Sequence, residues 1–174
     1  MKTLRLILGD QLNENHSWFS SVDDQIFYCI FEMRQETDYV QHHIQKVIGF
    51  FAAMRAFGKR LKDEGHRVHY FKINDAKNHQ NLEKNIKLLI EQNNIGHFEY
   101  QAPDEYRLDE QMRTICSAIK ISYKCHDSEH FLTTRGELSS FFEGKKQLLM
   151  ERFYRYMRKK HHILMVGEQP EGGI

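Results

Sequence analysis

The chain has 174 residues, of which 40% are apolar and 28% charged, so it can bury a core of its own and is not a disordered sequence. Its formal net charge of +1 identifies no partner, and its apolar stretches are too short for a signal peptide or a membrane span. Three cysteines without a C-x-x-C pair argue against a disulfide framework or a zinc site, so we expect a reducing compartment, by default the cytoplasm.

Five short apolar runs predict β-strands, at residues 3–8, 26–31, 67–72, 97–101 and 119–124. The first two are nearly continuous, which is typical of strands buried on both faces of a parallel sheet. Apolar residues at helical spacing predict helices between them, at residues 42–64, 82–92 and 108–118. This alternation predicts an α/β fold, a doubly wound (Rossmann-like) five-stranded parallel sheet with flanking helices.

A helical carboxyl-terminal tail follows the last strand. We expect helices at residues 136–142 and 145–160, separated at Gly144, and a turn-rich end without a structured element at 168–174. From Lys145 onward the chain contains seven Lys/Arg and three Asp/Glu, so this segment carries a net charge of +4 and the rest of the chain −3. A basic segment thus follows an acidic body.

Ligands of open parallel sheets bind beyond the carboxyl ends of the strands, and the first run ends in Gly9, Asp10 and Gln11. Gly9 permits a tight turn and a close approach, while Asp10 and Gln11 offer an acceptor and an amide to the edge of a heterocycle. The G-x-G-x-x-G spacing of a dinucleotide site is absent. The alternative is that these residues form only a strand-ending turn.

The second run leads into a polar loop at the same edge, where Glu36 is a candidate acceptor for ring N–H groups or hydroxyls. Thr37 or Asp38 is expected to cap the following helix. Phe50 and Met54 lie on the apolar stripe of that helix, and they either belong to the core or line the face of a bound ring.

The segment 145–160 interleaves basic and aromatic residues. We consider its basic side chains as possible DNA or interdomain contacts, namely Arg152, Arg155, Arg158 and Lys159. The alternative is a solvated helix, because no motif that reads duplex DNA accompanies it. The adjacent pairs His42-His43 and His161-His162 point apart on a helix and form no metal site.

Several stretches in this order resemble the photolyase-related proteins of the iron–sulfur bacterial cryptochrome and photolyase class. They are LRLILGDQL, ETDYVQHHIQKV with FFAAMRAF, PDEYRL, FLTTRGEL, and MERFYRYMR followed by LMVGEQPEGG. The resemblance covers essentially the whole chain. It implies an α/β domain that binds an antenna chromophore, typically a ribityl-lumazine, with Gly9, Asp10 and Glu36 near it and Phe50 and Met54 as ring neighbours.

The resemblance also implies a second, helical domain that binds FAD and a four-iron cluster, contacts DNA and repairs photoproducts with light. The sequence reaches only the linker to that domain, and its cysteines match no cluster motif. We therefore expect an antenna-binding domain at residues 1–166, the start of a linker at 167–174, the helical domain as partner, and no repair by this chain alone. The alternatives are a module that contacts nucleic acid and a purely structural module that packs on a partner domain. In none of these cases do we expect a membrane as partner.

Overall fold

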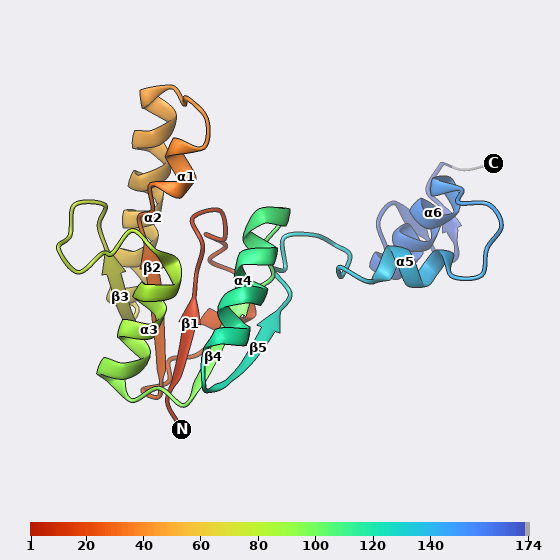
Figure 1. Ribbon diagram of the computed structural model, residues 1–174. Helices are drawn as coiled ribbons and strands as arrows, with labels where there is room; N and C mark the ends of the chain where they lie inside the picture. The colour runs from red at the N-terminus through yellow and green to blue at the C-terminus, as the bar shows by residue number, and fades with distance from the viewer. Residues whose placement is uncertain (173–174) are drawn as a thin grey trace. The chain divides into compact units, whose positions relative to one another are not determined.

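The structure is a computed structural model that describes residues 1–172, and the chain divides into two compact units, Met1–Ser128 and Glu129–Ile174 (Figure 1). The antenna-binding domain expected at residues 1–166 takes in the first unit and most of the second. Its extent stays a prediction. The two units are described separately below.

A five-stranded parallel sheet forms the centre of the first unit, in the order β3-β2-β1-β4-β5 (Figure 1). The strands are β1 (Thr3–Leu6), β2 (Ile26–Phe31), β3 (Arg67–Phe71), β4 (His97–Gln101) and β5 (Ser122–His126). The order reverses beside β1, as in doubly wound sheets. The predicted fold class is therefore confirmed.

Helices cover both faces of this sheet. Helix α2 (Ile44–Asp63) packs its apolar stripe against Ile7, Tyr28 and Ile30 on one face, together with Trp18 of the 3₁₀ helix Ser17–Phe19. On the other face, α3 (Leu82–Asn93) and α4 (Tyr106–Ala118) bury Leu4, Leu6 and Cys29. Side chains of one strand alternate between the two cores, which is why β2, with the sequence IFYCIF, is apolar throughout.

The loop after β2 differs from its prediction. It holds a single helical turn, α1 (Gln35–Asp38), and α2 begins only at Ile44. The cap of α2 is His43, whose Nδ1 accepts the Gln45 N–H at 3.2 Å. Capping by Thr37 or Asp38 was wrong, because these residues lie in α1, and Thr37 donates its hydroxyl to the Arg34 carbonyl instead.

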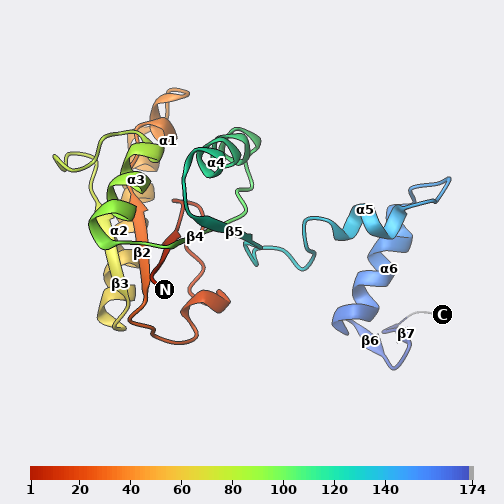
Figure 2. The same cartoon turned by 60° about the horizontal axis from the view of Figure 1, so that its bottom comes forward.

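The second unit consists of α5 (Glu137–Phe142), α6 (Met150–His161) and a short hairpin of β6 (Met165–Val166) and β7 (Gln169–Pro170) (Figure 2). Helix α6 begins five residues later than predicted, since Leu149 still has extended backbone. The unstructured end predicted from residue 168 was also wrong for Gln169 and Pro170. Gly167 has a φ of +57° and permits the tight turn that pairs them with β6. Residues 173–174 of that prediction lie outside the described part.

Within residues 1–172 we find no helix with the length and apolar character that a membrane crossing requires.

Candidate functional site

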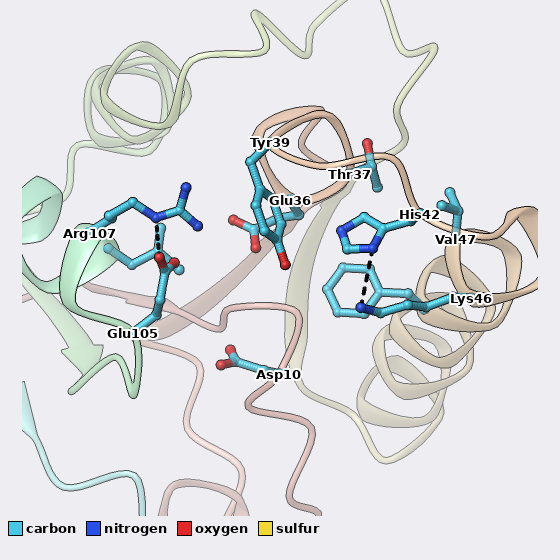
Figure 3. A pocket seen from close by; sticks show the side chains of 11 residues that line it. Asp10, Glu36, Thr37, Tyr39, His42, Lys46, Val47, Glu105 and Arg107 are labelled. Atoms are coloured by element: carbon cyan, nitrogen blue, oxygen red, sulfur yellow. Dashed lines mark hydrogen bonds and ion pairs between the residues drawn. The ribbon is translucent and has the colours of Figure 1, made fainter.

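A cavity of about 250 Å³ lies in the first unit, beyond the carboxyl ends of the strands (Figure 3). Three loops at this edge contribute to its lining: Asp10 follows β1, Glu36 follows β2, and Glu105 follows β4. The first turns of α2 supply the remaining wall, including Val47 and Phe50. The cavity thus occupies the place where doubly wound sheets bind their ligands.

Three carboxylates belong to the polar lining. Asp10 is exposed, whereas Glu36 and Glu105 are half-buried. Burial raises the pKa of Glu36, and the hydrogen bond from the Gln35 amide 3.3 Å away lowers it. The charges of Asp10 and Glu105 add a smaller upward effect and that of Arg107 a smaller downward one, so the net shift is upward. The cavity therefore offers hydrogen-bond acceptors in a negative local field.

Two ring side chains and two basic side chains lie beside these carboxylates. The Arg107 guanidinium forms an ion pair with Glu105 and lies over the Tyr39 ring, 4.7 Å from its centre. On the other side, the His42 ring meets Tyr39 edge-on at 5.0 Å, and Lys46 Nζ lies 3.3 Å from His42 Nδ1 (Figure 3). These contacts give the cavity flat ring surfaces beside its acceptors.

Gly9 serves packing between β1 and α2. A Cβ atom built at Gly9 would lie 2.3 Å from Phe50 Cζ and 3.1 Å from Met54 Sδ. Phe50 is half-buried and lines the cavity, but Met54 is only 1% exposed and belongs to the core. Phe50 thus lines the cavity, and Met54 has the core role that the sequence left open.

Gln11 is absent from the cavity wall. Its side chain is 1% exposed, its Oε1 accepts the Leu8 N–H at 3.1 Å, and its Nε2 donates to the Gln101 carbonyl at 3.2 Å. Both ends of the amide therefore tie the end of β1 to the end of β4. The sequence led us to expect this amide to face a ligand, but the side chain is buried and does not line the cavity.

The basic residues of α6 are largely engaged within their own unit. Arg155 pairs with Glu151 at 2.7 Å, Lys159 approaches Glu168 at 3.4 Å, and Arg158 donates to the carbonyls of residues 163 and 164. Arg152 is exposed. A contact of Arg152, Arg155, Arg158 and Lys159 with DNA or another domain stays a prediction, and such a contact would have to displace these internal pairs.

The sequence did not point to several residues of the cavity, namely Tyr39, His42, Lys46, Val47, Glu105, Arg107 and Leu108. One available signal was the loop after β4. It lies beside the loop after β1 at the point where the strand order reverses, so its Glu105 and Arg107 were predictable neighbours of Asp10.

Comparison with known proteins gives one family and two relatives. The family model of the deoxyribodipyrimidine photo-lyase-related proteins matches residues 5–174. A (6-4) photolyase of Agrobacterium fabrum is 38% identical over 176 residues, which cover 99% of this chain and 34% of that protein. An uncharacterized protein of Acanthamoeba polyphaga mimivirus is 25% identical over 183 residues, covering 99% of this chain and 90% of that protein.

The chain therefore spans about a third of the length of the Agrobacterium photolyase. The family match begins at Arg5 in β1 and extends through both compact units to the end of the sequence. On this evidence the chain belongs to the deoxyribodipyrimidine photo-lyase-related protein family.

Proposed function

We propose that this chain is the antenna-binding domain of a photolyase-related flavoprotein that repairs DNA photoproducts with light. The observation that carries the proposal is the cavity at the strand ends, where Asp10, Glu36 and Phe50 meet. The flavin, the iron–sulfur cluster and the contact with DNA belong, in this proposal, to the helical domain that the sequence resemblance implies.

The residues present fit a ribityl-lumazine. A lumazine ring needs a flat apolar contact and acceptors for its ring N–H, and its ribityl chain needs acceptors for hydroxyls. Phe50 and Tyr39 supply the ring surfaces, and Asp10, Glu36 and Glu105 supply acceptor oxygens. When bound, the pigment would absorb near-ultraviolet to violet light and pass the excitation to the flavin.

The chain's own residues would hold and orient the pigment. Phe50 is fixed by its packing on Gly9, so its ring stays at one depth in the cavity. Arg107 makes a cation–π contact with Tyr39 and an ion pair with the Glu105 carboxylate. Both side chains are therefore held at the wall of the same cavity. Because these side chains are already held in place, binding a ligand costs the protein little additional side-chain entropy.

A titration of the chain with ribityl-lumazine, followed by its fluorescence, tests the proposal. The wild-type chain should bind the pigment, and the Asp10→Ala, Glu36→Ala double variant should bind at least about tenfold more weakly, because hydrogen bonds to charged acceptors contribute about 1.5–3 kcal/mol each. An Asp63→Ala, Glu64→Ala variant removes the same charges at the far end of α2 and should bind like wild type. Full binding by the Asp10, Glu36 variant would contradict the assignment.

A further inference from the structure

The second unit buries little of its own apolar surface. Within its described residues, 129–172, Phe153 is the one buried side chain. Eleven of the nineteen exposed large apolar side chains of residues 1–172 lie in this unit, although it is the smaller of the two. Domains of about 40 residues usually need support beyond their own core, and large exposed apolar patches mark interaction surfaces. The unit thus has the surface of a part that a partner covers.

Several of these apolar side chains line a groove of about 480 Å³. Phe131 and Leu132 come from the segment before α5, while Tyr154, Met157 and Ile163 come from α6 and the residues after it. Phe131 and Leu132 are 65% and 61% exposed, so the unit's own core does not use them. A groove of this size and lining is suited to apolar side chains presented by a partner helix.

Hydrogen bonds hold the lining of the groove in place. His161 Nε2 donates to the Leu132 carbonyl at 3.0 Å, which ties the segment before α5 to α6. Arg158 Nε donates to the Ile163 carbonyl at 3.2 Å, and the same guanidinium donates to the Leu164 carbonyl. Because these bonds fix the shape of the groove, a partner that docks there has little additional chain to order.

The charge beside the groove distinguishes among possible occupants. Helix α6 carries five Lys/Arg and one Glu, and its Arg158 belongs to the groove lining. A second copy would place the same basic helix against this one and cost like-charge repulsion. Duplex DNA matches the charge but offers its phosphates rather than apolar side chains to the groove. The groove and its charge therefore favour a protein surface with apolar side chains flanked by carboxylates.

The longer relative has room for such a surface. This chain covers 34% of the Agrobacterium photolyase, so most of that protein lies outside the match. We propose that the groove of the second unit is a docking surface for the helical domain of the proposed flavoprotein, which fills it with apolar side chains flanked by carboxylates. This inference rests on the proposed function, because that proposal supplies the helical domain.

Hydrogen–deuterium exchange of two proteins, this chain and the Agrobacterium photolyase, tests the inference. Contacts within the matched region are common to both proteins, so a difference in exchange reports contacts with the rest of the photolyase. We expect the backbone amides aligned with residues 129–134 and 162–166 to exchange at least about tenfold more slowly in the photolyase, after correction for sequence. The amides of α3, in the core of the first unit, are the control and should exchange at similar rates in both.

The double substitution Leu132→Asp, Ile163→Asp separates docking from a role in the fold of this chain. Both side chains are exposed, so the double variant of this chain should melt at the wild-type temperature, whereas Phe153→Asp, at the buried ring, should melt lower. In the photolyase, aspartates at the two positions aligned with Leu132 and Ile163 should return the exchange of both segments to the rate in this chain.

The outcomes separate this inference from the proposed function. Equal exchange of the two segments in both proteins overturns the inference, whereas the titration with ribityl-lumazine does not depend on it. Protection in this chain that disappears on dilution, or that appears with added duplex DNA, assigns the groove to a second copy or to DNA and overturns the inference. A lower melting temperature of the Leu132→Asp, Ile163→Asp variant assigns these residues to the chain's own core and overturns their docking role.

Discussion

Glu32 is a fully buried carboxylate at the end of β2, and it organises the loop that follows β3. Its oxygens accept from Arg55 at 2.6 and 2.9 Å, from the Tyr70 hydroxyl at 2.7 Å and from the Ile73 N–H at 2.8 Å. Burial alone would raise the pKa of Glu32, but these donors outweigh it and lower the pKa below its usual value. The carboxylate is therefore stabilised in its charged form by the fold.

We predict that Glu32→Gln lowers the free energy of unfolding at neutral pH by about 2 kcal/mol, because Arg55 and Tyr70 lose a charged acceptor. The half-exposed position of Arg55 limits the size of this loss. A group whose pKa is lowered on folding stabilises the protein above its unfolded pKa and loses that contribution as the pH falls through its folded pKa. The difference between variant and wild type in urea unfolding should thus shrink in acid. Glu64→Gln, at an exposed pair with Arg60, should change stability by less than about 0.5 kcal/mol. A difference that stays constant with pH would contradict this role of the Glu32 charge.

Gly9 gives a second prediction at the same scale. In Gly9→Ala the new methyl group would collide with Phe50, so the ring must turn toward the cavity. We expect a stability loss of about 1–2 kcal/mol and weaker binding of ribityl-lumazine. Gly49→Ala is the matched control on α2, where a Cβ meets nothing within 4 Å, and it should stabilise the helix by about 0.5–1 kcal/mol. Thermal unfolding and the fluorescence titration measure both effects, and unchanged binding by Gly9→Ala would show that Phe50 does not touch the ligand.

At the scale of elements, β2, β3 and β4 were predictable to within one residue, β1 ends two residues earlier than predicted, and the edge strand β5 was not predictable. Apolar runs placed β2 and β4 at their observed bounds, because both faces of these strands are covered. In contrast, β5 was predicted at 119–124 and lies at Ser122–His126, with Ser122 to Cys125 exposed. Ile119 and Ile121 instead pack against the core as the chain leaves α4. An exposed edge strand has no apolar pattern, so pairing with β4 alone sets its register.

The same reasoning explains the candidate site. Asp10, Glu36 and Phe50 follow from the rule that ligands bind at strand ends. The burial of Gln11 does not follow from it, since a glutamine that bridges two strand ends and one that meets a ligand have the same local sequence. Likewise, the cap of α2 at His43 depends on the single turn of α1, which four residues of sequence do not reveal.

Helix α3 offers a test of a local signal. Asn81 is its N-cap, and the Oδ1 atom accepts the Lys84 N–H at 2.9 Å. Asn81→Ala should lower the free energy of unfolding by about 1 kcal/mol, whereas Asn81→Ser keeps an acceptor and should cost only a few tenths. Urea unfolding distinguishes the two. Equal losses in both variants would show that the side-chain cap contributes little to α3.

At the scale of the whole molecule, everything that forms the cavity lies in the first unit. The residues that line it end at Leu108. One apolar core of the sheet ends at Cys116 or the partly buried Ile121, and the other ends at Leu61 or the partly buried Ile73. A unit of 128 residues is large enough to bury a core that is stable without further support. The basic helix α6 and its aromatic partners belong to the second unit and form a cluster of their own, in which Phe141 contacts Phe153 and Tyr156 at 5.2 and 5.0 Å.

We therefore predict that a fragment of residues 1–128 folds cooperatively and binds ribityl-lumazine with the affinity of the full chain, within about threefold. Circular dichroism on heating and the fluorescence titration check the two statements separately. A control fragment of residues 1–104 loses α4 and β5, which exposes one side of β4 and removes Glu105 and Arg107, and it should neither melt cooperatively nor bind. If the longer fragment folds but binds far more weakly than the full chain, then residues after 128 contribute to the ligand site, and the cavity at the strand ends is only part of it.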